Sequence, residues 1–223
     1  MRDPLAGSSW SAPGTVAGFK RSLPNAVLMQ FAEQELRRSG GGRVLDIGCG
    51  AGRNAVPLAQ MGWHVVGSDL SWPMLCGAAE RAREAQAVHL CLVLASMENV
   101  PARDRSVDLV VAHGIWNLAR SAAQFRQGLT EAARVAKPGA GLFVFTFSRN
   151  TFPPETPAVA GEPFVFTQFS GEPQCFLTEA QLVAELSLAG FAQEAGVPIR
   201  EYNRPHAATL CSGTAPVIYE GVF

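Results

Sequence analysis

A short glycine-rich segment contains the residues of this chain whose types and spacing most clearly suggest chemistry. An apolar strand, Val44-Leu45-Asp46-Ile47, leads directly into Gly48-Cys49-Gly50-Ala51-Gly52. Glycine at every second position lets the backbone adopt conformations that a β-carbon forbids, so the N–H groups of the loop can lie against a ligand. The pattern therefore predicts a loop that binds a nucleotide-containing cofactor.

The spacing of these glycines helps to separate two classes of cofactor. A dinucleotide fingerprint, G-x-G-x-x-G/A, counted from Gly48 needs Gly or Ala where this chain has Arg53. Counted from Gly50, the fingerprint is met by Ala55, so a nucleotide-dependent oxidoreductase is an alternative. The fuller pattern is D-x-G-x-G-x-G, in which Asp46 brings a carboxylate to the mouth of the loop. That carboxylate favours a cationic ligand.

Residues 44–52 resemble the first motif of the class I S-adenosylmethionine-dependent methyltransferases. The segments Gly52-Arg53-Asn54-Ala55-Val56-Pro57-Leu58-Ala59 and Gly62-Trp63-His64-Val65-Val66-Gly67-Ser68-Asp69-Leu70-Ser71 are similar to the tellurite-resistance-like and other small-molecule branches. The resemblance is strong over residues 40–150 and loose over residues 175–223. It implies a Rossmann-like methyltransferase fold that binds S-adenosylmethionine and releases S-adenosylhomocysteine.

The resemblance also assigns residues to the cofactor. Asp69 ends the second expected strand, where a carboxylate can accept hydrogen bonds from both hydroxyls of a ribose; a helix N-cap at Asp69 or Ser71 is the alternative. Leu70 would pack on the adenine, and Met97 would lie either on the ring face or in the core. Ser96 stands where the family usually has Asp, and its neutral hydroxyl is a weaker acceptor for the adenine amino group.

Three residues of the loop have competing interpretations. The Cys49 side chain is expected to face the core rather than to be a reactive thiol. Arg53 pairs with the cofactor carboxylate or with Asp46, or is simply exposed. Asn54 is expected to cap the following helix. The complete set of expected cofactor-binding residues is Asp46, Gly48, Cys49, Gly50, Gly52, Arg53, Asn54, Asp69, Leu70, Ser96, Met97 and His113.

The segment Ala112-His113-Gly114-Ile115-Trp116-Asn117-Leu118 follows another apolar strand and carries the candidate catalytic residue. His113 is either a general base or a positioning residue, because the ordinary pKa of histidine lies near neutrality. Trp116 is expected to face the sulfonium or the substrate. The segment lacks the N/D-P-P-Y/F motif of nucleic-acid amino methyltransferases, and only Asn117 matches the metal ligands of catechol methyltransferases, so both reactions are disfavoured.

Composition bounds the class of protein. The 223 residues are 48% hydrophobic with a net charge of -1, which fits one domain with a sizeable core and gives no footprint for nucleic acid. The five cysteines are scattered and the four histidines show no metal-ligand spacing, so reduced thiols and no metal site are expected. With no signal peptide and no long apolar run, a soluble cytoplasmic protein, monomeric or homodimeric, is expected.

Hydrophobic periodicity predicts the elements that position these residues. Strands are expected at 43–48, 63–69, 88–95, 107–113 and 141–148, and helices at 54–61, 72–86, 121–136 and 178–189. Further strands are expected near 191–201 and 216–223. The fully apolar strands indicate a parallel sheet between two layers of helices. The resemblance implies a doubly wound α/β fold: a mostly parallel seven-stranded sheet with helices on both faces and an antiparallel last strand.

Two segments lie outside this alternation. Residues 1–38 are expected to form an N-terminal lid and helix, and residues 1–14 should be mobile unless a bound ligand orders them. Val27, Leu28, Phe31 and Ala32 share a helical face that covers the sheet edge or cofactor mouth. Residues 149–176 contain five prolines and five phenylalanines and are too apolar for a linker. They predict a substrate lid in which Phe164 and Phe166 contact the substrate, although coverage of a sheet edge or a dimer contact is the alternative.

Taken together, the sequence predicts one methyltransferase domain over residues 1–223 that methylates a small soluble acceptor. A non-catalytic S-adenosylmethionine-binding module and a nucleotide-dependent oxidoreductase are the alternatives. No acid-base pair is obvious, which suits a reaction in which alignment of donor and acceptor supplies most of the catalysis.

Overall fold

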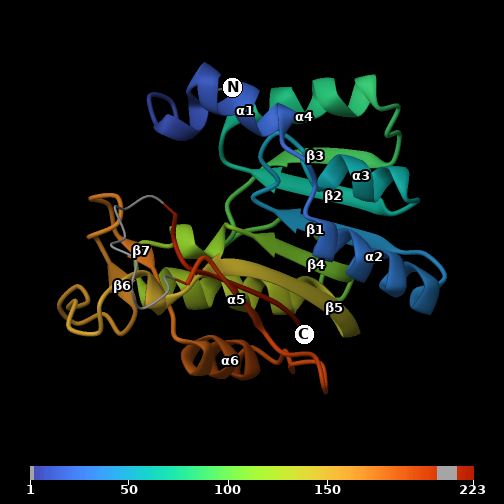
Figure 1. The fold of residues 1–223 in the computed structure, drawn as a ribbon. Helices are drawn as coiled ribbons and strands as arrows, with labels where there is room; N and C mark the ends of the chain where they lie inside the picture. The colour runs from blue at the N-terminus through green and yellow to red at the C-terminus, as the bar shows by residue number, and fades with distance from the viewer. Residues whose placement is uncertain (1–2, 205–214) are drawn as a thin grey trace.

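A seven-stranded sheet in the order β3-β2-β1-β4-β5-β9-β8 organises the chain, of which the computed structural model describes residues 3–204 and 215–223 (Figure 1). Its strands are β1 (Arg43–Ile47), β2 (His64–Asp69), β3 (Leu90–Leu94), β4 (Val107–His113), β5 (Ala136–Phe147), β8 (Arg200–Tyr202) and β9 (Ile218–Val222). Strands β1 to β5 pair in parallel, and β9 runs antiparallel to both β5 and β8. The predicted doubly wound α/β fold with an antiparallel last strand is confirmed.

Helices cover both faces of this sheet, which is why its central strands are apolar throughout. The helices are α1 (Pro13–Arg21), α2 (Ala26–Ser39), α3 (Ala55–Gln60), α4 (Trp72–Glu84), α5 (Ala122–Val135) and α6 (Glu179–Leu188). Helices α2, α3 and α4 share one hydrophobic cluster with one face of the sheet, and α5 and α6 share a second cluster with the other. Thr178 caps α6 through a capping box with Gln181.

Some element boundaries differ from the prediction. Strand β5 begins at Ala136 instead of at residue 141, so Lys137-Pro138-Gly139 lies in the irregular start of this strand. The pairing register of β4 and β5 shifts between Val107 and Leu109, which accommodates the proline there. Strand β8 is only three residues long because most of residues 191–199 is an exposed loop.

The N-terminal residues that the sequence predicts to be mobile are packed on α4. The Asp3 carboxylate accepts a hydrogen bond from the Trp72 N–H at 3.1 Å, and the Ser11 and Ser71 hydroxyls lie 2.9 Å apart. The short 3-10 turn η1 (Ser9–Ser11) and α1 follow, and Lys20 pairs with Glu80 and Glu84 of α4. The prediction failed because these anchors join residues that are far apart in the sequence.

Helix α2 packs on the face of β4 and β5 through Leu28, Phe31 and Ala32. It therefore covers the sheet face and not the sheet edge, whereas Asn25, at its N-terminus, reaches the carboxyl end of the sheet.

Residues 149–176 leave the carboxyl end of β5 and return to α6. They contain the turn η3 (Arg149–Thr151) and a separate antiparallel pair, β6 (Val165–Phe166) with β7 (Gln174–Cys175). Glu162 accepts a hydrogen bond from the Ala122 N–H at 2.8 Å, which ties the segment to the first turn of α5. The segment is thus an ordered insertion on the α5 side of the molecule.

No helix within residues 3–204 and 215–223 combines the length and the apolarity needed to cross a membrane.

Candidate cofactor and acceptor site

The expected cofactor residues gather at the carboxyl end of the sheet, on both sides of the point where the strand order reverses. From β1 the chain moves outward to β2 and β3, and then crosses to β4 and β5 on the other side (Figure 1). The glycine loop follows β1, and His113 ends β4, its direct neighbour. Open α/β sheets bind ligands in the crevice at this reversal.

The three loop glycines all need the conformational freedom that the sequence attributes to them. Their φ angles are +70° at Gly48, +53° at Gly50 and +75° at Gly52, in the left-handed region that disfavours side chains. A β-carbon on Gly48 would lie 2.7 Å from Cδ1 of Ile115, which follows β4. On Gly50 it would lie 3.5 Å from the Phe19 ring of α1. The loop is therefore a tight cradle, with α1 above it.

Asp46 lies beneath the loop instead of at its mouth. Only 1% of its surface is exposed, and its Oδ2 atom has no hydrogen-bond partner in the structure. Burial and the nearby Asp69 carboxylate raise the pKa of Asp46 to about 7, against the opposing effects of Arg53 and the Ala55 N–H. A buried carboxylate oxygen without a partner requires a cationic group or a bound water to satisfy it.

The Asp46 pKa makes a testable statement about stability. A carboxyl group whose folded pKa lies above its unfolded value stabilises the fold below the unfolded value of about 4, and this contribution is lost as pH rises through about 7. Asp46→Asn removes the ionisation. We therefore expect the unliganded variant to gain stability relative to the wild type between pH 5 and pH 8, by a few kcal/mol.

Urea unfolding of both proteins at several pH values measures this difference. A stability difference that stays constant from pH 5 to pH 8 would mean that the Asp46 carboxylate ionises in the fold without penalty.

Asp69 holds the glycine loop and the start of α4 together. Its Oδ2 accepts a hydrogen bond from the Gly50 N–H at 2.9 Å, and its Oδ1 accepts one from the Ser71 N–H at 2.8 Å. The N-cap of α4 is Ser71, whose hydroxyl accepts from the Met74 N–H, so Asp69 is not the cap. Each carboxylate oxygen keeps a second lone pair, which leaves room for ribose hydroxyls.

The structure shows the contacts of three further predicted residues in and beside the loop: Cys49, Asn54 and Arg53. The Cys49 thiol faces the core, as predicted, burial raises its pKa, and its N–H donates to the Ser68 carbonyl, so its expected contact with the cofactor stays a prediction. Asn54 does not cap α3; its Oδ1 accepts the Asn25 N–H at 3.0 Å. Arg53 is half-buried, its pKa is lowered by burial, and its Nε has no partner in the structure.

At the next strand end, Ser96 and Leu70 are half-buried, so their expected contacts with the adenine stay predictions. Met97 is 7% exposed and belongs to the core cluster on the α5 face. Its side chain packs near Gly128 of α5, which favours the core interpretation over contact with a ring.

His113 is held as a neutral side chain. Burial, with the positive charge of Arg53, lowers its pKa to about 4, and its ring stacks on Phe145 with centroids 4.2 Å apart. Its Nε2 lies 3.3 Å from the Asn25 amide nitrogen, so it accepts a hydrogen bond there. A histidine of this pKa is a poor general base at neutral pH, and the geometry favours the positioning role.

The aromatic residues expected to meet the substrate are mostly core residues. Trp116 and Phe164 are each 1% exposed and pack edge-to-face with Phe125 of α5. Both side chains point to the α5 side, where their apolar area is buried. The sequence alone does not distinguish an aromatic residue of the core from one that lines a pocket. Phe166 is also buried, but within a separate cluster formed by Phe147, Phe152, Phe166, Phe169 and Phe176.

Three residues at the site were not assigned from the sequence. The Asn25 amide donates to Glu220 Oε2 at 2.7 Å, and the Tyr202 hydroxyl donates to Glu220 Oε1 at 2.7 Å. The sequence offered two signals for these residues: a single acidic residue in the apolar strand β9 (Ile218–Val222), and an Asn directly before an amphipathic helix. His206 and Cys211, also considered at the sequence level, lie outside the described residues.

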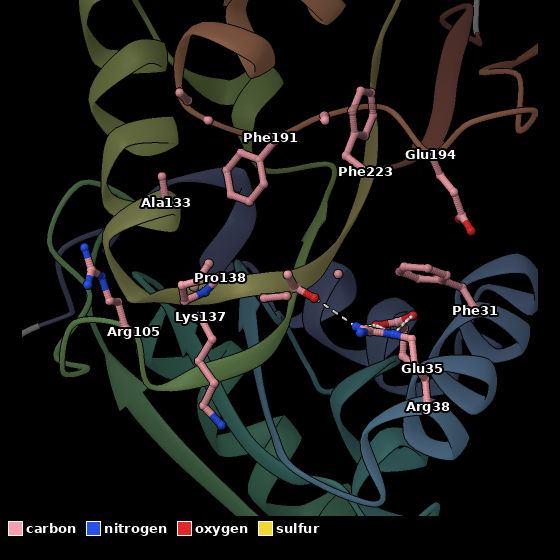
Figure 2. Close-up of a pocket in the computed structure, with 17 residues that line it drawn as sticks. Phe31, Glu35, Arg38, Arg105, Ala133, Lys137, Pro138, Phe191, Glu194 and Phe223 are labelled. Atoms are coloured by element: carbon pink, nitrogen blue, oxygen red, sulfur yellow. Dashed lines mark hydrogen bonds and ion pairs between the residues drawn. The ribbon is translucent and has the colours of Figure 1, made fainter.

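A cleft of about 620 Å³ lies at the opposite end of the sheet and is unrelated to this site (Figure 2). Phe31, Phe191 and Phe223 line it, and Arg38 closes one side by pairing with Glu35 and donating to the Gly139 carbonyl. Because the amino ends of the parallel strands meet here, the cleft is far from the glycine loop. In the described part of the chain, no three His, Cys, Asp or Glu side chains are grouped as metal ligands, and the expectation of no metal stays a prediction.

Comparisons with known proteins bear on this geometry. Residues 44–139 match a family model described as a methyltransferase domain. A demethylmenaquinone methyltransferase of Corynebacterium urealyticum is 29% identical over 164 residues, which cover 73% of this chain and 62% of the relative. These matches support placement of the chain in the class I S-adenosylmethionine-dependent methyltransferase superfamily. The recognition made from residues 44–71 is confirmed for the superfamily, and the tellurite-resistance-like branch stays a prediction.

Other relatives of this chain support the same placement. The ubiquinone/menaquinone biosynthesis C-methyltransferase UbiE of Syntrophotalea carbinolica is 37% identical over 125 residues, covering 55% of this chain and 51% of the relative. The chain thus spans between about half and two thirds of these two relatives. A solved S-adenosylmethionine-dependent methyltransferase of Methanosarcina mazei shares the fold, with a TM-score of 0.68, 21% identity, and coverage of 90% of this chain and 97% of the other.

The residues present fit the cofactor of this superfamily. The partnerless Oδ2 of Asp46 matches a cationic ligand such as one bearing an ammonium group, and the glycine cradle leaves no space for a β-carbon at Gly48. Asp69 can add ribose hydroxyls to its two backbone partners.

Proposed function

We propose that this methyltransferase transfers the methyl group of S-adenosylmethionine to a small acceptor with a planar aromatic body. The observation that carries the cofactor half of the proposal is Asp46, a buried carboxylate with a partnerless oxygen directly beneath the glycine cradle. The dinucleotide alternative is disfavoured because it does not account for this carboxylate. When bound, the cofactor supplies an electrophilic methyl group, and the chain supplies position and exclusion of water.

The N-terminal segment closes the cofactor side in this proposal. Phe19 of α1 lies over Gly50, and Trp10 packs edge-to-face on Phe19 with centroids 6.0 Å apart. The Ser11 contact with Ser71 places the segment beside Asp69. Residues 3–22 therefore act as the cover over the ribose and the transferring methyl group, which narrows the lid expected for residues 1–38 to this segment.

The insertion at residues 149–176 supports an aromatic acceptor. Phe147 shares the sheet face of His113 and Phe145 because alternate residues of a strand point the same way. Phe147 is half-buried and Phe169 is 38% exposed, and their rings are 5.5 Å apart. These two rings form the accessible side of the aromatic cluster, whereas Phe166 supports them from behind. The names of the relatives, which include a demethylmenaquinone methyltransferase, agree with a planar acceptor.

A panel assay tests this function. Wild-type protein with S-adenosylmethionine and a set of hydroxylated or aminated aromatic compounds should release S-adenosylhomocysteine with at least one acceptor. Phe169→Ala should lower turnover about tenfold or more while S-adenosylhomocysteine affinity and stability stay near wild type, because Phe169 is exposed. Binding of the cofactor without release on any acceptor would favour a non-catalytic binding module.

We also propose that the protein works in the cytoplasm on a small molecule and not on nucleic acid, as a monomer or homodimer. The described cysteines are all unpaired thiols, which suits a reducing compartment, and acidic and basic residues nearly balance.

A further inference from the structure

Glu220 is a buried carboxylate that the cofactor does not explain. It is 4% exposed on β9, and its partners are two neutral groups, the amide of Asn25 and the hydroxyl of Tyr202. Among the described residues, no Lys, Arg or His nitrogen lies within 4.0 Å of a Glu220 carboxylate oxygen, although Arg200 stands opposite Glu220 in the register of β8 and β9. A buried carboxyl group whose hydrogen-bond partners are both neutral is costly to retain, and its retention points to a further partner that arrives from outside the chain.

The sheet register places Glu220 on the row of residues at the reaction edge. His113 pairs with Phe145, and Phe145 pairs with Glu220, so the three side chains project from the same face at the carboxyl end of β4 and β5. The Asn25 amide bridges His113 and Glu220, with distances of 3.3 and 2.7 Å. These two side chains therefore lie close together beside the loop that holds the cofactor.

Asn25 fixes this arrangement from the other side. Its Oδ1 accepts the Leu28 N–H at 2.9 Å, so its NH₂ group must be the part that faces Glu220 and His113. Its backbone N–H donates to Asn54, which directly follows the glycine loop region. Asn25 thus joins the cofactor loop, the end of β4 and the Glu220 carboxylate in one hydrogen-bond network.

We propose that Glu220 is the anchor of the acceptor: its carboxylate accepts a hydrogen bond from an N–H or O–H group of the acceptor and orients the acceptor toward the cofactor. This inference rests on the proposed methyltransferase function and adds the chemistry of the acceptor, a planar aromatic compound that carries such a donor. Each carboxylate oxygen keeps a second lone pair, so the acceptor can bind without displacing Asn25 or Tyr202.

Calorimetric titration with two cofactor analogues tests the anchor without an identified acceptor. S-adenosylhomocysteine has a neutral sulfur at the reaction centre, whereas sinefungin carries an ammonium group there. A carboxylate that faces the transferring methyl group attracts this ammonium. We expect wild-type protein to bind sinefungin about tenfold more tightly than S-adenosylhomocysteine, and Glu220→Gln to remove most of that preference.

Glu201 of β8 offers a matched control. It pairs in register with Tyr219, so it projects from the opposite face to Glu220, where it accepts hydrogen bonds from Ser148 and Asn150. Glu201→Gln should keep the wild-type preference for sinefungin. Both substitutions preserve the size of the side chain and its capacity to accept a hydrogen bond, and the affinity for S-adenosylhomocysteine should stay within about threefold of wild type in each.

The outcomes separate the anchor from the proposed function. If wild-type protein binds S-adenosylhomocysteine but does not prefer sinefungin, the proposed role of Glu220 is wrong and the methyltransferase assignment stands. This outcome is measured on wild-type protein alone. If Glu220→Gln folds and keeps the preference, Glu220 is only a structural link to Asn25. If wild-type protein binds neither analogue, the proposed function itself fails.

Discussion

Gly48→Ala is expected to destabilise the protein by about 2 to 5 kcal/mol and to weaken binding of S-adenosylhomocysteine more than about 100-fold. Two separate effects combine at this position. The φ angle of +70° costs about 1 to 2 kcal/mol for a residue with a β-carbon. The added methyl group would also lie 2.7 Å from Ile115, which forces the end of β4 and the loop apart.

Gly139→Ala is the matched control for Gly48→Ala. Gly139 has a φ of +75°, and a β-carbon there meets nothing within 4 Å, so this variant should show the backbone cost alone. Its cofactor affinity should equal that of wild type, because Gly139 lies at the other end of the sheet. Chemical unfolding and calorimetry of both variants measure the two quantities. If Gly48→Ala binds S-adenosylhomocysteine within about threefold of wild type, the loop is not the cofactor cradle.

Asp69→Ala is expected to weaken cofactor binding about 100-fold. Loss of two charge-assisted hydrogen bonds to a ribose, each contributing about 1.5 to 3 kcal/mol, accounts for this effect. The structure adds a second consequence, because the Gly50 and Ser71 N–H groups lose their acceptor. The unliganded variant should therefore also be less stable, by about 1 to 3 kcal/mol.

Asp69→Asn separates the two consequences. One amide oxygen remains to accept a backbone N–H, so stability should fall less than in Asp69→Ala, whereas the lost charge should still weaken cofactor binding about tenfold. Calorimetry and urea unfolding of the two variants provide the comparison. Reduced stability with unchanged affinity in both variants would assign Asp69 to the architecture of the loop alone.

The sequence predicted the parts of the site that are encoded locally. The glycine spacing, Asp46 and Asp69 stand at fixed positions relative to their own strands, so motif and strand periodicity place them together. The parallel sheet followed in the same way from apolar strands that alternate with amphipathic helices.

The sequence did not predict the contacts that join distant segments. Asn25 and Glu220 are 195 residues apart, and only the tertiary fold brings the α2 N-terminus to β9. Phe164 shows a different limit: an aromatic side chain in an apolar insertion suits a pocket and a core equally well, and packing on α5 decides between them. The depth of Asp46 depends on how the following helix covers it. The sequence does not give this packing, and Asp46 was therefore expected at the loop mouth.

Calorimetric titration of the wild-type protein tests the central claim most directly. S-adenosylmethionine or S-adenosylhomocysteine should bind with a micromolar dissociation constant, about -8 kcal/mol, through the Asp46, glycine-loop and Asp69 arrangement, whereas NAD should show no detectable binding. Tighter binding of NAD than of either sulfur compound, or no binding of the sulfur compounds, would contradict the account.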